Sequence, residues 1–143
     1  MLRKFGIIAV LSLIVAALAA VPALAANPHE VGNNPIVCEE VQGGTAVQCS
    51  GSIAGLGSAD RVTISIDARL ACETRSGSNQ PGGHLQATTD PLRVKSGRVN
   101  FTVTTEAADC PRGLNPVVGE TATITVRDAS TGEVLVRFTR PIL

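Results

Sequence analysis

The sequence predicts a single all-β domain behind an N-terminal export signal. Three observations carry this prediction: apolar and polar residues alternate along much of the chain, branched Val, Ile and Thr outnumber Leu after the leader, and four cysteines follow an apolar start. Branched side chains suit the pleated surface of a sheet, and a period of two marks strands with one buried face. The length of 143 residues is that of one domain.

The first 25 residues have the pattern of a secretory signal peptide. A short basic start precedes an almost unbroken apolar run over 5–21, which is followed by Pro22 and then by Ala23-Leu24-Ala25. Small residues at the end of such a run are what a signal peptidase requires. A membrane anchor is the alternative, because the run approaches the length that spans a bilayer. We expect cleavage of residues 1–25, or one residue later, and a secreted, extracellular domain over 26–143.

Removal of the leader changes the charge balance. The chain has twelve Lys and Arg against twelve Asp and Glu, and Arg3 and Lys4 belong to the leader, so ten basic groups remain against twelve acidic ones. A net charge of −2 gives no electrostatic case for nucleic acid or for an anionic membrane. Aromatic residues make up 2% of the chain, with no Trp and no Tyr, so stacking platforms for sugars or bases are lacking. We expect no nucleic-acid partner and no membrane insertion after cleavage.

An even number of cysteines in an exported domain predicts two disulfides. A two-residue turn at Gly43-Gly44 would place Cys38 directly opposite Cys49, because both lie equally far from the centre of that turn. Opposed strand residues are within disulfide reach. Cys72 then pairs with Cys110 by elimination. Chain-entropy arithmetic assigns about 3 kcal/mol to the first bridge and about 4 kcal/mol to the second.

The strands are predicted in chain order from their apolar faces. Two weak strands over 36–41 and 45–53 flank the Gly43-Gly44 turn. The longest alternation follows over 61–72 and is the clearest strand signal in the chain. Its apolar face consists of Val62, Ile64, Ile66, Ala68, Leu70 and Cys72.

Four more strands complete the pattern. They cover about 84–94, 99–103, 121–126 and 134–138. The first of them should bend at Asp90-Pro91, because Pro cannot donate to a ladder. The last two should form a hairpin across Ala129-Ser130-Thr131-Gly132, where Gly suits a left-handed position. Helical periodicity is limited to at most one turn at 106–109.

Seven short strands in about 118 residues predict an immunoglobulin-like Greek-key β-sandwich of about seven strands. A small closed barrel is the alternative architecture. The Trp core typical of antibody domains is absent from the sequence, so this expectation concerns architecture only.

Two polar segments, 73–83 and 105–119, are the predicted loops. If Cys72 bonds Cys110, both loops meet at one end of the domain, where binding sites usually lie on a rigid scaffold. The alternative is that they are ordinary surface loops that need a disulfide to hold them in place. The candidate binding residues on them are Arg75, Asn79, Gln80, His84, Arg112 and Asn115.

No catalytic or metal-binding pattern is found in the sequence. It contains no nucleophile elbow after the leader, and the glycine-rich 55–60 precedes a strand and is interpreted as a turn. His29 and His84 lie in different regions, so we expect exposed histidines and no metal site. Asp67 is interpreted as an ordinary residue at the edge of the long strand. We therefore expect no enzyme and no cofactor.

The chain has one local basic cluster, around the turn at Ser96-Gly97. We expect it to serve solubility, with contact to an acidic partner as the alternative. Its members are Arg93, Lys95 and Arg98.

Several short segments together resemble a group of small secreted bacterial proteins of actinobacterial type. These segments are Asn27-Pro28-His29, Gly55-Leu56-Gly57, Ala71-Cys72, Asn79-Gln80-Pro81-Gly82, the strand over 97–105 and Cys110-Pro111. The resemblance implies a secreted β-sandwich of uncharacterised function and brings no catalytic residues. One departure is the segment 112–116, where that group often carries an Asn-Pro-aromatic sequence.

Two better understood families share the plan of a secreted β-domain with two disulfides. Neocarzinostatin-type apoproteins hold a small molecule in a cleft, and subtilisin-inhibitor-like proteins present a disulfide-tied loop to a protease. The favoured function is non-enzymatic binding or cell-envelope association, with an unknown protein or small-molecule ligand. The alternatives are a secreted protease inhibitor or small-molecule-binding apoprotein, and an unrecognised extracellular hydrolase or metal enzyme.

Overall fold

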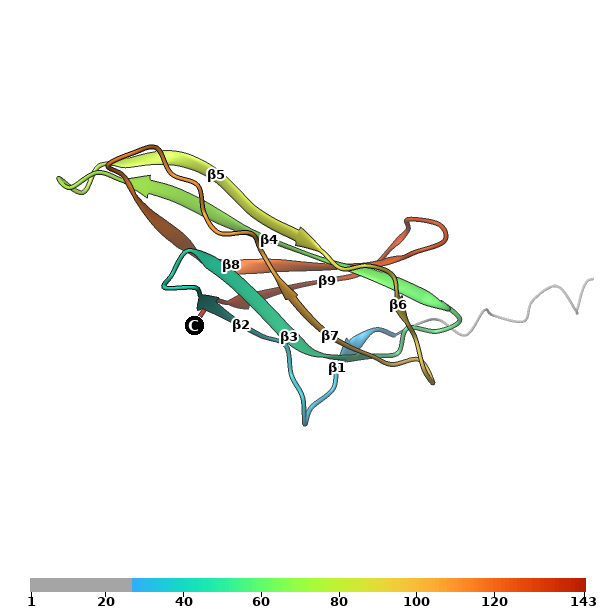
Figure 1. The fold of residues 1–143 in the computed structure, drawn as a ribbon. Helices are drawn as coiled ribbons and strands as arrows, with labels where there is room; N and C mark the ends of the chain where they lie inside the picture. The colour runs from blue at the N-terminus through green and yellow to red at the C-terminus, as the bar shows by residue number, and fades with distance from the viewer. Residues whose placement is uncertain (1–26) are drawn as a thin grey trace, which may run out of the picture.

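The computed structural model describes residues 27–143, apart from the side chains at 80–82, and these residues form two β-sheets without a helix (Figure 1). The strands are β1 (His29–Glu30), β2 (Val37–Val41), β3 (Ala46–Ala54), β4 (Arg61–Glu73), β5 (Asn79–Thr88), β6 (Leu92–Arg93), β7 (Val99–Thr104), β8 (Asn115–Asp128) and β9 (Val134–Pro141). The predicted leader, residues 1–25, lies outside the described residues. The all-β prediction is confirmed, whereas the single helical turn allowed at 106–109 does not form.

The strands divide into two antiparallel sheets. Sheet 1 is built around β3, with β1 and β2 along one edge and β7 along the other. Sheet 2 has the order β5-β4-β8-β9, and β6 continues the β5 edge along β4. The predicted bend at Asp90-Pro91 is the gap between β5 and β6. Two short strands, β1 and β6, were therefore not predicted as separate elements.

The β2–β3 hairpin confirms the predicted register and corrects the turn. Cys38 lies opposite Cys49, and these residues form a disulfide with a Cα–Cα distance of 4.1 Å. The connection is four residues long, Gln42–Thr45, and not the expected two, because pairing ends at Val41 and Ala46. The centre of the turn is unchanged by the longer loop, so the opposition of the cysteines is unchanged too.

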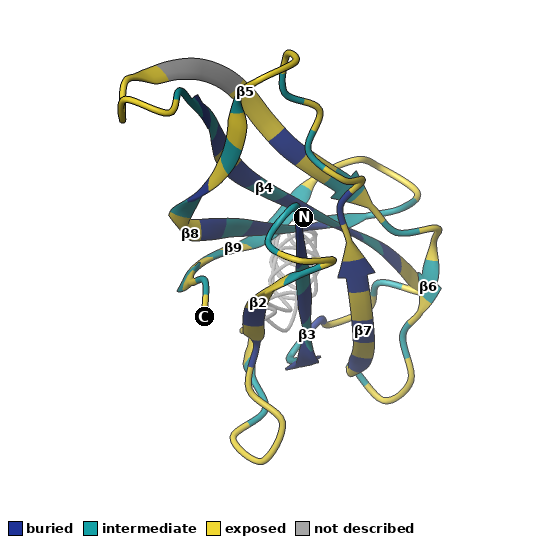
Figure 2. Cartoon of the chain, turned by 60° about the vertical axis from the view of Figure 1, so that its left-hand side comes forward, coloured by how far each residue is buried: buried dark blue, intermediate teal, exposed yellow. Residues whose placement is uncertain are grey.

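The core lies between the sheets and is formed by the faces that alternation predicted. All six residues of the predicted β4 face are buried. Val99, Phe101 and Val103 of β7 are buried as well, and Figure 2 shows the resulting bands of buried and exposed residues along that strand. The buried cluster includes residues of β3, β4, β7 and β8, which makes the fold sandwich-like.

One side of the sandwich is closed by contacts of β1, β2 and the last residues of the chain. Leu143 donates its N–H to the Cys38 carbonyl at 2.9 Å and accepts the Glu40 N–H at 3.1 Å, so the C-terminus pairs with β2. The Arg140 guanidinium donates two hydrogen bonds to the Glu30 carboxylate, which also accepts the Ile36 N–H at 2.9 Å. These contacts join β1 and β2 of sheet 1 to β9 of sheet 2.

Gly55 allows two segments of the sequence resemblance, the one at Asn27 and the one at 55–57, to lie in contact. The Asn27 carbonyl oxygen would lie 2.1 Å from a Cβ at position 55, and Gly55 has a φ of +74°. No L-residue with a side chain fits there without moving the backbone. The start of the described chain and the Gly55-Leu56-Gly57 turn are therefore packed directly against each other.

Sheet 2 extends beyond sheet 1 as a distal arm. We use this name for β4 from Arg69, β5 up to Leu85, β8 up to Gly119 and the connecting loop 105–114. Figure 1 shows that loop running along the β4–β5 hairpin out to its tip. The Cys72–Cys110 disulfide fixes the loop there, with a Cα–Cα distance of 5.7 Å.

Both predicted loops are shorter than expected. Strand β5 begins at Asn79, so the first connection is only the turn 74–78, and β8 begins at Asn115, so the second is 105–114. The polar sequence of both segments masked strand residues, because both strands pair with β4 at the tip while Asn79 and Asn115 at their starts are exposed.

Candidate functional site

Two bulges meet at one point of β4 and shape the distal arm. Between Ala68 and Leu70 the pairing with β8 jumps from Ala122 to Val118, so three residues of β8 lie opposite Arg69 alone. The pairing with β5 shifts by one residue directly beyond, between Leu70 and Ala71. Bulges bend a sheet and increase its twist, and they are frequent beside functional sites.

Glycines make this distortion possible. Gly83 in β5 has a φ of +90°, which residues with side chains rarely adopt. Gly119 in β8 faces Arg69 so closely that a Cβ would lie 3.3 Å from the Arg69 Cβ. The missing side chains leave room above the sheet at the bulge.

That room is a hollow of about 380 Å³ on the distal arm. Its lining combines an apolar floor with two nitrogen-rich side chains: Arg69, Leu70, Ala71, Gly83, His84, Val117, Val118 and Gly119. Val117 is one of three large apolar residues that the described chain exposes, with 39% of its surface accessible. We call this site the arm hollow.

His84 is held in place at the rim of the arm hollow. Its Nδ1 lies 2.7 Å from the Asp67 Oδ1, and Gln86 donates from Nε2 to the Asp67 Oδ2 at 2.6 Å. Because an ionised carboxylate only accepts, the Nδ1 carries the proton and the Nε2 is left to other partners. Asp67 pairs with Gln86 across β4 and β5, and Arg69 pairs with His84 in the same way.

The electrostatics keep the Asp67 carboxylate ionised. Partial burial alone would raise its pKa, but hydrogen bonds from Gln86 and His84, with the charges of His84 and Arg69, lower the pKa below its ordinary value. Asp67 was predicted to be an ordinary strand-edge residue, and this interpretation is wrong. It lies in the middle of β4 and orients His84.

Few other reactive groups contact His84 in the described part of the chain. Among residues 27–143, no hydroxyl or thiol is hydrogen-bonded to His84, and the same range holds no group of three or more potential metal ligands. A second hollow of about 300 Å³ shares His84 with the first and is bordered by Glu106 and Asp109. His84 therefore lines two hollows, and the second also contains two carboxylates.

The six predicted binding residues are brought to the distal arm in two groups. Asn79 and Asn115 lie opposite Glu73 on its two sides, with Arg75 in the turn and Arg112 in the loop at the same tip. His84 lies several residues away, at the arm hollow. Gln80 belongs to β5, and its side chain is outside the described residues.

Sequence reasoning missed Arg69 and Val117 as site residues. Arg69 looks like an ordinary outward-facing position of the long strand, and Val117 falls inside the predicted loop 105–119. The pairs Gly82-Gly83 and Val118-Gly119 were the available signal, since glycine inside a strand pattern marks a bulge or a close approach.

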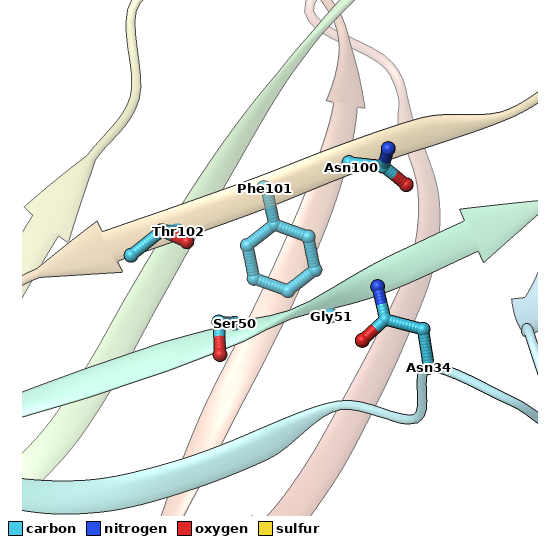
Figure 3. A pocket seen from close by; sticks show the side chains of 6 residues that line it. All are labelled: Asn34, Ser50, Gly51, Asn100, Phe101 and Thr102. Atoms are coloured by element: carbon cyan, nitrogen blue, oxygen red, sulfur yellow. The ribbon is translucent and has the colours of Figure 1, made fainter.

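A third hollow, of about 430 Å³, lies on sheet 1 and is uncharged (Figure 3). Its Asn34 and Asn100 are joined through Ser52: the Asn34 Nδ2 donates to the Ser52 Oγ at 2.5 Å, and the Ser52 hydroxyl donates to the Asn100 Oδ1. Figure 3 shows Ser50 and Thr102 at its other end. Because its polar groups bind one another, this hollow works as a seam between β7 and the β1–β2 connection.

Comparison with known proteins does not assign the chain to a family. No protein-family model matches the chain, and no curated protein sequence matches it. Within the part of the chain that the structure describes, no helix is long and apolar enough to cross a membrane.

Proposed function

We propose that the protein is a secreted, non-enzymatic binding protein whose arm hollow takes a small ligand with an apolar body and an anionic group. The leader pattern supports export, and two disulfides with no free cysteine in residues 27–143 fit an oxidising compartment. The observation that carries the proposal is the arm hollow itself, with its apolar floor, Arg69 and an oriented His84.

We also infer that the fold is an immunoglobulin-like Greek key. The chain passes from β3 in sheet 1 to β4 in sheet 2, returns to sheet 1 for β7, and crosses again to β8. Alternation between two facing sheets in this order is the plan of such sandwiches. The parallel contact of Cys38 with Ile142, which joins the first long strand to the last, supports the same assignment.

The lining of the arm hollow favours this class of ligand on physical grounds. Small-molecule sites are concave and mostly apolar, with a few polar groups that fix orientation. Val117 and Ala71 offer apolar contact, and Arg69 offers a fork of N–H donors for a carboxylate or sulfonate. The free Nε2 of His84 adds a second polar contact on the same side.

The protease-inhibitor alternative has weaker support. The turn 74–78 is short and internally bonded: Thr74 donates its N–H to the Ser78 carbonyl, and Gly77 donates to the Thr74 carbonyl, both at 3.0 Å. A protease cleft takes an extended segment, which a closed turn of this kind does not offer.

The proposal is tested with 8-anilinonaphthalene-1-sulfonate, an apolar anion that fluoresces on binding. The chain has no Trp and no Tyr, so the probe is measured without protein background. We expect saturable binding to the oxidised protein, and we expect Arg69→Gln to weaken it about tenfold, since a charged hydrogen bond contributes about 1.5 kcal/mol or more.

Arg75→Gln is the matched control, because it removes the same charge from the tip of the arm outside the hollow. It should leave the probe affinity within twofold of wild type. Absence of saturable binding, or equal weakening by both variants, would overturn the arm hollow as the ligand site.

A further inference from the structure

The outer face of sheet 2 carries a line of arginines outside the distal arm. Val62 and Val126 are buried, so their neighbours Arg61 and Arg127 face outward from β4 and β8. The line is completed by Arg93 in β6, directly opposite Arg61, and by Arg137 in β9, opposite Thr125. We call Arg93, Arg61, Arg127 and Arg137 the arginine row.

The register sets the spacing of the row. Side chains directly opposite on neighbouring strands have Cβ atoms about 5 Å apart, and diagonal neighbours are about 7–8 Å apart. Arg93 and Arg61 are directly opposite, whereas Arg127 is diagonal both to Arg61 and to Arg137. The row therefore crosses four strands in regular steps and does not gather at one point.

No member of the row forms an ion pair with a carboxylate of residues 27–143. The two ion pairs among residues 27–143 are His84–Asp67 and Arg140–Glu30, and neither involves it. Arg127 donates from Nη1 to the Gly132 carbonyl at 3.3 Å. Asp128, the acidic neighbour of Arg127, accepts the Ser130 N–H at 2.8 Å within the hairpin turn.

Arg93 lies directly opposite another cation, Arg61, and no ion pair of the described residues offsets their repulsion. Like charges directly opposite on two strands are destabilising, and Arg61 faces Arg93 in this way. Beyond Arg93 the row continues into a hollow of about 280 Å³ at the β6–β7 turn, where Lys95 and Arg98 add two cations. Six of the ten basic residues after the leader thus belong to the row or to this adjoining hollow.

We propose that the arginine row binds a linear polymer that carries repeated phosphate groups. An extended row of cations suits a chain of anions better than a single small one. Guanidinium groups hold phosphate through paired hydrogen bonds, and all four members of the row are Arg. The described residues hold only two Phe and no Trp or Tyr, so few rings are present for stacking and we expect recognition to rest on the anionic backbone itself.

This surface shares no residue with the arm hollow, so the two proposals stand separately. The net charge of −2 after the leader argues against binding of polyanions only if the charges are spread evenly over the surface. The register places the four arginines of the row on the outer face of sheet 2.

The test measures binding of the oxidised protein to fluorescently labelled long-chain inorganic polyphosphate. We expect binding in 50 mM salt that weakens with salt, with a log–log slope of about −3 for four released counterions. The double variant Arg61→Gln/Arg127→Gln should lower the affinity at least tenfold and reduce the slope by about 1.4. Its melting temperature should not fall, because the opposed arginine pair is relieved.

The matched control is Arg75→Gln/Arg112→Gln, which removes two charges at the tip of the arm. This variant should retain at least half of the wild-type affinity. The proposal is overturned if polyphosphate does not bind, or if both double variants lose affinity equally. Equal affinity for a sulfated polysaccharide would also overturn it, because the surface would then bind polyanions without preference for phosphate.

Discussion

The two halves of sheet 2 are covered in different ways. In the near half, β4 from Arg61 to Ala68 shares a buried core with β3 and β7 of sheet 1. In the distal arm, Leu70, Leu85 and Val118 belong to the same buried cluster, and partly buried Ala108 and Cys110 of the loop pack against it. A loop covers a sheet less completely than a second sheet does, and a disulfide has to hold it in place.

The difference explains where the molecule has room for function. The near half is regular, and its outer face is free to carry long charged side chains in fixed register. The arm is irregular at its two bulges, and there a hollow forms. Rigid scaffolding in one half and tolerated distortion in the other is the arrangement expected of a binding domain.

The largest expected effect comes from removing the bridge that holds the arm. Cys72→Ala/Cys110→Ala should destabilise the protein by about 4 kcal/mol, because the bridge closes a loop with a sequence separation of 38 residues. Hydrogen exchange should rise first in the arm, over 69–85 and 105–119. Thermal unfolding with exchange mass spectrometry measures both effects.

The matched control is Cys38→Ala/Cys49→Ala in the near half. It should cost about 3 kcal/mol, since its separation is 11 residues, and its loss should not free the arm. Equal exchange in both halves after removal of Cys72–Cys110 would show that the loop is held by packing alone.

The near half was predictable from sequence because its information is local. Alternation set the buried face of β4, and the symmetry of the Gly43-Gly44 turn placed Cys38 opposite Cys49. Both features depend on neighbouring residues, so no knowledge of the second sheet was needed.

The arm was only partly predictable because its information is not local. Asn79 and Asn115 look like loop residues, yet both are paired with Glu73 in the sheet. The link from Asp67 to His84 depends on the β4–β5 register, which was not deduced from the sequence. Two bulges at one point of β4 cannot be deduced from the polarity of any single strand.

Shortening one core side chain in each half measures how far sheet 1, or the loop 105–114, moves into the space that is left. Ile64→Ala should cost about 4 kcal/mol, because Ile64 is completely buried between two sheets. Leu70→Ala should cost about 2–3 kcal/mol, since a loop can move into the space more easily than a strand. Urea unfolding of both variants gives the two free energies, and an equal or larger cost for Leu70→Ala would mean that the loop is as rigid as sheet 1.

The smallest expected effect is the loss of the ion pair that joins the chain ends of the near half. Glu30→Gln should cost about 1 kcal/mol at neutral pH, the upper range for a partly exposed pair. Hydrogen bonds from the Arg140 guanidinium lower the pKa of Glu30, against partial burial that would raise it. Stabilisation from a carboxylate with a lowered pKa is present above its unfolded value, about 4.3, and is lost as the pH falls through the folded value.

The difference in stability between wild type and Glu30→Gln should therefore be constant above about pH 5 and shrink below about pH 4. Glu39→Gln is the control, because it removes one charge from an exposed position of β2. Urea midpoints at a series of pH values separate the two variants. A Glu30→Gln cost that persists unchanged at pH 3 would mean that it does not come from the ionised carboxylate, and the hydrogen bond from the Ile36 N–H would be its source. The arm should show the same hydrogen exchange in both variants, since it is joined to neither chain end.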